Sequence, residues 1–197
     1  MTGYLNGAEE IRIGSGELLL TFFEEALRMR ADHLAMLAAY ADDGAFADTA
    51  LRTLWERALL SVDMTIVVRT PASVEAVLRA TRLRPRRCDI RISLQLHAKV
   101  FVAWRRGAEI ALVGSHNLTG AALHTNQEIG MLIKPAGDIT RGIVRHLRAV
   151  VGAVVRNSSP YRTARVRPLP DRDPAAAGSP VRSRNAFDNV CPGDSVT

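Results

Sequence analysis

Five polar side chains that suit the chemistry of phosphate esters lie in one third of the sequence: His97, Lys99, Ser115, Asn117 and Glu128. A neutral imidazole can attack phosphorus and form a covalent intermediate, which divides one difficult displacement into two easier ones. An ammonium, a hydroxyl and an amide can stabilise the charge that develops on the non-bridging oxygens. A carboxylate bonded to the far ring nitrogen fixes the tautomer of the imidazole, and Glu128 is the candidate for this task. The set is therefore suited to phosphodiester cleavage.

Two predicted strands would bring these side chains together. The strands are residues 97–104 and 109–114, joined by a turn around Gly107. His97 and Lys99 are two residues apart, so in a strand they face the same side. If the hairpin folds about Arg106 and Gly107, the pair lies near Asn117 and Ser115 at the open end. Glu128 begins the next apolar strand, residues 128–133.

Each of these motifs alone has an ordinary structural explanation. An H-x-K triplet fits an exposed strand end, and Gly-Ser-x-Asn is usually a turn or a helix cap. Their occurrence in order on adjacent strands, followed by an acid, favours a site. Strand alternation directs His116 away from this site, to the surface or to a supporting position. We expect His124 at an exposed helix end, and Trp104 in packing rather than in base stacking.

The remaining pattern predicts one α/β or α+β domain, a mixed sheet flanked by helices. We expect helices over residues 17–30, 49–60, 72–81 and 139–155, and further strands over residues 64–68 and 89–96. Residues 33–40 fit a buried strand or a helix continuation. We divide the chain into an N-terminal helical extension (1–32), a catalytic domain (33–156) and a disordered tail rich in Arg and Pro (157–197).

Composition excludes several other classes of protein. Apolar residues make up 47% of the 197 residues, and no apolar run reaches the roughly 18–20 residues of a membrane span. The first sixteen residues do not predict a signal peptide. Cys88 and Cys191 lie far apart, and no dense carboxylate cluster is near the motif. We therefore expect a cytoplasmic protein without disulfides, metal or other cofactor.

The net charge of +6 is unevenly distributed along the chain. Residues 1–60 carry five Arg against ten acids, and residues 61–197 carry 21 basic residues against ten acids. A basic surface suits a polyanion such as nucleic acid, although a general solubility charge explains it equally well. The arginines at 82, 84, 86 and 87 are a solvated loop or a DNA contact. Only two basic residues are Lys, and one of them is Lys99.

The motif resembles the H-x-K…G-S-x-N signature of the phospholipase D superfamily, carried by residues 97–99 and 114–117. Residues 126–130, with their acid, are similar to its nuclease branch. The resemblance implies that His97 is the nucleophile, that Lys99, Ser115 and Asn117 bind phosphate, and that Glu128 orients the histidine. It also implies a mixed sheet flanked by helices.

Two departures from the family pattern refine this expectation. Trp104 stands where the family usually has Asp, which favours the nuclease branch over the lipases. The chain also has one motif, whereas the chemistry uses two histidines. We therefore expect a homodimer with one composite site on its dyad.

Three functional hypotheses follow. The first is a metal-independent nuclease that cleaves DNA, in preference to RNA, through phosphohistidine. The second is a lipid phosphodiesterase, which the missing Asp and the excess of Arg disfavour. The third is a nucleic-acid-binding subunit without catalysis. By analogy, a nuclease of this size is a candidate for a larger restriction or defence complex.

Overall fold

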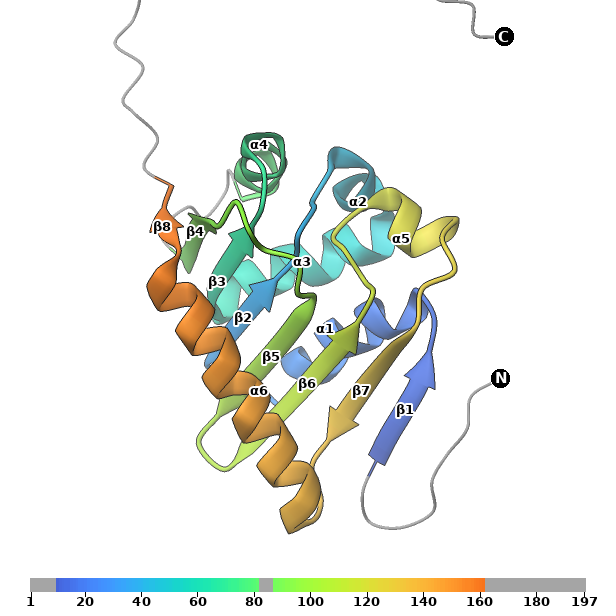
Figure 1. Cartoon of the computed structure of the whole chain (residues 1–197). Helices are drawn as coiled ribbons and strands as arrows, with labels where there is room; N and C mark the ends of the chain where they lie inside the picture. The colour runs from blue at the N-terminus through green and yellow to red at the C-terminus, as the bar shows by residue number, and fades with distance from the viewer. Residues whose placement is uncertain (1–9, 82–86, 162–197) are drawn as a thin grey trace, which may run out of the picture. The chain divides into compact units, whose positions relative to one another are not determined.

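The computed structural model describes residues 10–81 and 87–161. Eight strands form one mixed sheet in the order β1-β7-β6-β5-β2-β3-β4-β8 (Figure 1). The strands are β1 (Glu10–Gly14), β2 (His33–Leu37), β3 (Asp63–Val68), β4 (Cys88–Ile92), β5 (Val100–Arg105), β6 (Ala108–Gly114), β7 (Gly130–Lys134) and β8 (Ser159–Pro160). The helices are α1 (Glu17–Arg28), α2 (Asp43–Ala47), α3 (Thr49–Ser61), α4 (Pro71–Ala80), α5 (Gly120–His124) and α6 (Asp138–Asn157).

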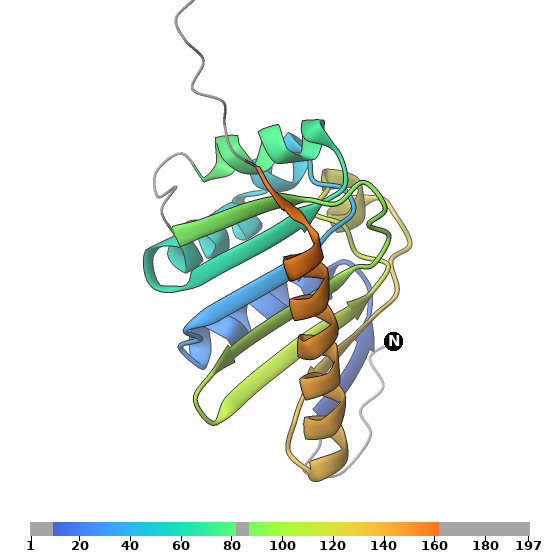
Figure 2. The ribbon, with the colours of Figure 1, turned by 60° about the vertical axis from the view of Figure 1, so that its left-hand side comes forward.

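The sheet is covered by helices on both faces, as the sequence predicts. β2, β3 and β4 are parallel to one another, and the other pairings are antiparallel. α1, α3 and α4 pack on one face around Phe22, Phe23, Trp55 and Phe101, which are at most 1% exposed. α6 crosses the other face (Figure 2), where Val144 and Val151 pack against strand residues such as Val102. The predicted fold class is confirmed.

Local sequence signals explain where several helices begin. Asp48 caps α3, because its carboxylate accepts a hydrogen bond from the Leu51 amide at 2.7 Å. Thr70 caps α4 in the same way, and Pro71 occupies the first helical position, where its missing N–H costs little. Asp42 caps α2, a short helix that is not among the predicted ones.

The predicted hairpin is confirmed in its turn and its register. Arg105 pairs with Ala108, so Arg106 and Gly107 form the two-residue turn, with Gly107 at φ +80°. A side chain at this left-handed position would be strained, which explains the glycine. The start of the strand was predicted wrongly. β5 begins at Val100, so His97 and Lys99 lie in the loop that precedes it.

The ends of the domain also differ from the prediction. The range 1–32 was expected to be a helical extension, yet it contains β1, which pairs with β7, and α1, whose apolar side joins the core. Residues 33–37 form a strand, which decides between the two alternatives for this segment. Within the predicted tail, Ser159 and Pro160 pair with β4. Asn157 ends α6, and residues 162–197 of that tail, with the arginines at 82, 84 and 86, lie outside the described residues.

No helix in the described part of the chain has both the length and the apolarity to cross a membrane. The cytoplasmic location stays a prediction.

Candidate active site

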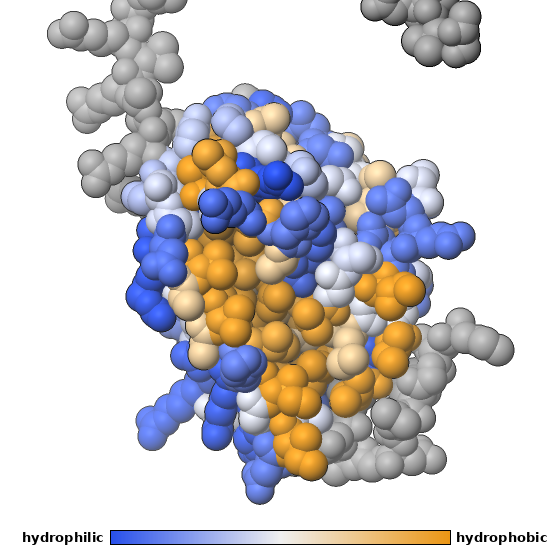
Figure 3. Space-filling model, in the orientation of Figure 1, coloured by the Kyte–Doolittle hydropathy of each residue, from blue (hydrophilic) through white to orange (hydrophobic). Residues whose placement is uncertain are grey.

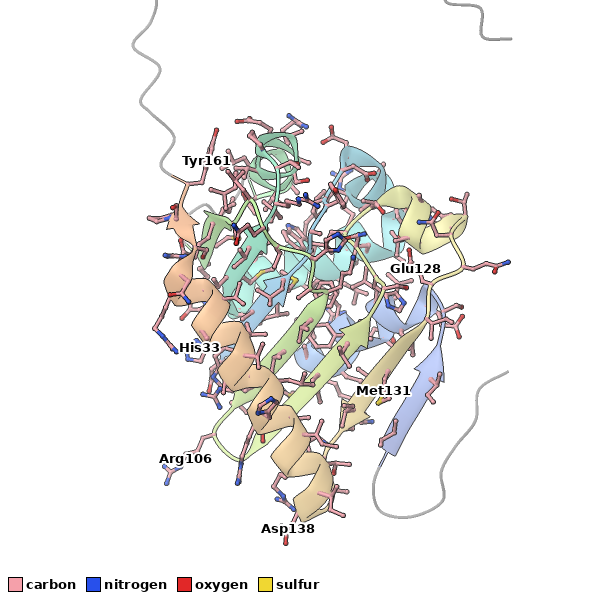
Figure 4. The ribbon with its side chains drawn as sticks, viewed as in Figure 1. His33, Arg106, Glu128, Met131, Asp138 and Tyr161 are labelled. Atoms are coloured by element: carbon pink, nitrogen blue, oxygen red, sulfur yellow. The ribbon has the colours of Figure 1, made fainter. Side chains whose placement is uncertain are left out.

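The predicted site residues lie at one end of three neighbouring strands. β5 begins there, β6 ends there and β7 begins there, so the loops beside these strand ends meet. The Gly114 amide donates to the carbonyl of Lys99 at 3.3 Å, which ties the end of β6 to the loop before β5. Gly114 also pairs with Gly130 at the start of β7. Figure 4 shows Glu128 at this end of the sheet and Arg106, at the tip of the hairpin, at the other.

His97 lies in an exposed loop whose ends are fixed on the domain. Leu96 is 4% exposed and belongs to the apolar cluster beneath α6, so it anchors the loop beside the histidine. His97 itself is exposed and takes no part in the core. The Lys99 ammonium donates to the carbonyl of His97 at 3.2 Å. An ammonium has three donors, so two remain for a ligand next to the imidazole.

Asn117 is oriented by the backbone of a neighbouring loop. Its Oδ1 accepts a hydrogen bond from the Tyr40 amide at 3.1 Å, and the Tyr40 carbonyl accepts one from the Leu118 amide at 3.0 Å. Because a backbone N–H can only donate, it fixes the oxygen of the Asn117 side chain and leaves the NH2 group to point elsewhere. That NH2 group has no partner among the described residues and can donate to an anion.

Ser115 and Glu128 form a closed hydrogen-bond network. The Ser115 hydroxyl donates to the Glu128 carboxylate and accepts from the Ile129 amide at 3.0 Å. The Asn126 side chain donates to the other carboxylate oxygen at 3.2 Å. Glu128 is 7% exposed, so these donors stabilise a buried charge. A hydroxyl has one proton to donate, and the Ser115 proton is engaged in the hydrogen bond to Glu128.

The contact predicted between Glu128 and the imidazole of His97 is not formed in the described part of this chain. The carboxylate bonds to Ser115 and Asn126 instead. The alternation argument placed Glu128 at the head of a strand, whereas β7 begins two residues later, at Gly130. Its side chain is therefore directed by the loop and not by the pleat of the sheet.

His116 is buried and connects the G-S-H-N segment to the core of the domain. It is 1% exposed, and its Nε2 lies 2.8 Å from the carbonyl of Ser15, which links the motif to the junction of β1 and α1. A Cβ on Gly130 would come within 2.4 Å of the imidazole, so only glycine leaves room for it. The alternation argument directed His116 away from the site, to the surface or to a supporting position, and its burial excludes the surface alternative.

The other singled-out residues have structural contacts. His124 ends α5, as predicted, and its Nε2 lies 3.3 Å from the Asp48 carboxylate. Trp104 packs between neighbours, with His33 stacked on it at 5.3 Å and the Arg148 guanidinium 4.4 Å from its ring. Within residues 10–81 and 87–161, no three His, Cys, Asp or Glu side chains are grouped to hold a metal ion.

Sequence reasoning missed two residues beside the site. Tyr40 is 41% exposed, and its hydroxyl lies 3.4 Å from a guanidinium nitrogen of Arg69. The Nε of Arg69 donates to the carbonyl of Leu94 at 3.1 Å and so holds the loop that carries His97. Tyr40 and Arg69 follow the carboxyl ends of parallel β2 and β3, where ligands commonly bind in open α/β sheets. That position was the signal that could have found them.

Comparison of the sequence with protein-family models and with curated proteins gives no match. Comparison with solved structures gives clear matches. NucT from Helicobacter pylori has a TM-score of 0.56 at 10% identity, over 78% of this chain and 99% of its own. Nuc from Salmonella typhimurium, a phospholipase D family member, has a TM-score of 0.51 at 19% identity, over 79% and 99%. The chain has a phospholipase D-type fold.

The same fold extends to a protein of another kind. TrmBL2, an archaeal chromatin protein with a novel mode of DNA binding, has a TM-score of 0.50 at 15% identity, over 79% of this chain and 54% of its own. At these identities the likeness concerns the fold. The phospholipase D-type fold agrees with the H-x-K…G-S-x-N motif, which was recognised from the sequence independently of any structure.

Proposed function

We propose that this chain is a metal-independent phosphodiesterase that cleaves DNA through a covalent phosphohistidine on His97. The observation that carries the proposal is that the loops beside the ends of β5 and β6, which the hydrogen bond between Gly114 and Lys99 ties together, carry three suitable groups. They are an exposed imidazole, an ammonium with two unused donors and an amide NH2 without a partner among the described residues, from His97, Lys99 and Asn117. The phospholipase D-type fold, shared with the phospholipase D family member Nuc, supports the class of reaction.

In the proposed first step a ring nitrogen of His97 attacks phosphorus. An N–P bond forms and the P–O bond to one DNA strand end breaks, while a second imidazole gives its proton to the leaving oxygen. A water molecule then attacks phosphorus, the second imidazole takes its proton, and the N–P bond breaks to release a phosphate monoester. Lys99 and Asn117 donate to the non-bridging oxygens in both steps.

Ser115 and Glu128 act together in this proposal. Because the hydroxyl proton of Ser115 is engaged by Glu128, Ser115 binds phosphate only when the hydroxyl rotates away from the carboxylate. Glu128 is proposed as a positioning residue that holds the start of β7 and the Ser115 loop in place. Its predicted role in orienting a histidine is retained as a proposal for the substrate-bound enzyme.

The second imidazole is proposed to come from a second copy of the chain. An apolar face supports a homodimer. Large apolar side chains lie exposed on the sheet face that carries α6 and on one flank of α6, and Figure 3 shows that this side of the molecule is extensively hydrophobic. They are Ile13, Met131, Ile139, Ile143 and Val150, with exposed fractions of 36–75%. Exposed apolar surfaces of this kind mark protein interfaces.

Two measurements test the dimer. Met131→Glu should convert the protein to monomers in sedimentation and remove its activity. Leu60→Glu, at a more exposed apolar position on α3 (57% against 36% for Met131) and outside the apolar face, should do neither. After subunit exchange with His97→Ala protein, activity should fall as the square of the wild-type fraction. A linear fall would show that each chain works alone.

The central test is cleavage of DNA in the presence of EDTA. Wild-type protein should cleave, and His97→Ala should not, while its melting temperature stays unchanged because the side chain is exposed. His124→Ala is the matched control, since its one ion pair is on the surface and contributes little. A phosphoryl group trapped after acid-free quenching of the reaction should map to His97. Loss of cleavage in EDTA would refute the metal-independent mechanism.

Two observations favour a second candidate, a DNA-binding protein without catalysis. TrmBL2, a chromatin protein that binds DNA, shares the fold, and one predicted phosphate donor, Ser115, is engaged by Glu128. This candidate predicts salt-sensitive DNA binding that survives His97→Ala, with no turnover by the wild-type protein.

A further inference from the structure

Four arginines form a line on one side of α6, away from the candidate active site. Arg141, Arg145, Arg148 and Arg156 are all exposed, and we call them the arginine stripe. Their spacings of four, three and eight residues return to the same side of a helix. The first and last are fifteen residues apart, so the arginine stripe extends over about 22 Å. The apolar residues Ile143 and Val150 occupy the opposite flank of the helix.

Two cavities follow the arginine stripe and share its central members. One, of about 410 Å³, lies between α6, the β5–β6 hairpin and the end of α1, and its charged lining consists of six cations and two acids. The other, of about 510 Å³, lies between α6 and the sheet; its charged lining is entirely arginine, and Trp104 contributes an aromatic ring. Arg145 and Arg148 line both cavities, so the two are neighbours along the helix.

The acids in this region do not balance its cations. Glu109 is the acid nearest the arginine stripe, and it lies 3.8 Å from Arg145 and 3.9 Å from Arg148, so one carboxylate serves two guanidinium groups. Glu25 is similarly shared by Arg28 and Lys134. Burial raises the pKa of Glu25, but the hydrogen bonds from these two cations outweigh it, so the pKa lies below its ordinary value.

Part of the arginine stripe is held rigid. The Arg148 guanidinium lies 4.4 Å from the centroid of the Trp104 ring, which is itself stacked against His33. A stacked guanidinium loses less freedom on binding than a solvated one. Arg141 and Arg156 have no acidic partner among the described residues, so they can contact a ligand without breaking an ion pair.

We propose that the arginine stripe binds the phosphate backbone of DNA at a surface separate from the catalytic site. Along one strand a duplex carries a phosphate every 3.4 Å, so about 22 Å of helix faces roughly six phosphates. Guanidinium groups match phosphate geometry, and a row of them binds without reading sequence. The proposal rests on the proposed nuclease function for its ligand, because a DNA substrate is what makes a second anchoring surface useful.

The test measures DNA binding apart from catalysis. All proteins carry His97→Ala, and a fluorescent 30-base-pair duplex is titrated by anisotropy between 50 and 200 mM salt. Arg141→Gln with Arg156→Gln should flatten the slope of log affinity against log salt by about 1.8, because each lost contact contributes about 0.9. Between 50 and 200 mM salt, the factor by which the affinity falls should therefore be about ten times smaller for this variant than for the parent. These substitutions leave no acid unpaired, so the fold is preserved.

A control double variant on α3, Arg52→Gln with Arg57→Gln, removes the same number of charges, one of them from a surface ion pair with Glu56, and should leave the slope unchanged. An unchanged slope in the arginine-stripe variant would overturn the proposal. If the parent protein bound poly-glutamate as tightly as it binds DNA, the proposal would also be overturned, because that result would indicate an acidic protein partner. In chains that retain His97, the arginine-stripe variant should hydrolyse bis(p-nitrophenyl) phosphate at the wild-type rate. If no chain hydrolyses this compound but binding follows the arginine stripe, the proposed nuclease function fails and the DNA-binding surface stands.

Discussion

Gly114, the first residue of the G-S-x-N motif, is predicted to be irreplaceable for a reason of packing. A Cβ at this position would lie 2.3 Å from the carbonyl oxygen of Ile129 and 2.6 Å from the Cα of Gly130. Both are backbone atoms, one at the start of β7 and one in the residue before it, so no side chain can rotate away. To reach even 3.0 Å, the oxygen must move by about 0.7 Å, which separates β6 from β7 at the site.

The expected cost of Gly114→Ala is about 1–3 kcal/mol, the usual range for overpacking. For a chain of this length, that corresponds to a melting temperature lower by roughly 2–12 °C. The displacement acts on the Ser115 and Ile129 hydrogen bonds, and misplacement by about 1 Å can reduce the rate of reaction by 10²-fold. We therefore expect a similar loss in kcat/KM for DNA cleavage.

The assay compares two glycine-to-alanine variants by thermal melting and by DNA cleavage. Gly142→Ala, on the surface of α6, places its Cβ in open space, so it should raise stability by about 0.5–1 kcal/mol and leave cleavage unchanged. A lower melting temperature for Gly114→Ala together with a higher one for Gly142→Ala would support the packing argument. If Gly114→Ala melts and cleaves like the wild type, the close approach of the two strands is not what the motif glycine provides.

Three further predictions concern single side chains. Asn117→Ala removes one phosphate donor and should lower kcat by about 10²–10³-fold, measured in single-turnover cleavage. Ser115→Ala leaves buried Glu128 with one fewer donor and should lower the free energy of unfolding in urea by about 1–3 kcal/mol, with Ser115→Thr restoring most of it. Burial raises the pKa of Cys88 to about 12, so iodoacetamide at pH 8 should modify this thiol only after unfolding. Because the unfolded thiol ionises near pH 9 and the folded one does not, stability should fall by about 1.4 kcal/mol per unit as pH rises from 9 towards 12, and Cys88→Ala should remove this dependence.

The sequence predicts best where a local pattern has one physical solution. Alternation on both sides of Gly107 determines the hairpin and its register, and Asp48 and Thr70 mark helix starts by their capping hydrogen bonds. β1 was missed because its five residues pair with a strand more than a hundred residues away, and no local signal records this partner. β8 has two residues and exists only through its pairing with β4.

The sequence predicts the end of the sheet at which the candidate residues lie, but not their contacts. The register of the hairpin, set by its turn, places the loop that carries His97 and Lys99 beside the end of β6. The partner of a carboxylate is set by loops, and the loop before β7 directs Glu128 to Ser115. Tyr40 was missed because its role depends on a backbone amide that reaches Asn117 across 77 residues of sequence.

The G-S-H-N segment has a structural task at each position, and this limits what one chain offers to a phosphate. Gly114 admits the neighbouring strand, Ser115 holds Glu128, His116 holds the carbonyl of Ser15, and the Asn117 oxygen holds the amide of Tyr40. Nδ1 of His116 has no partner but is buried, so among the described side chains of this segment the Asn117 NH2 group is the one left to donate to a phosphate, beside two donors of Lys99. A phosphodiester in its transition state needs charge stabilisation on two non-bridging oxygens and a proton for the leaving oxygen. One chain supplies the first through these donors and has one His97 for attack, so in the proposed mechanism the proton comes from a second copy that meets the apolar face.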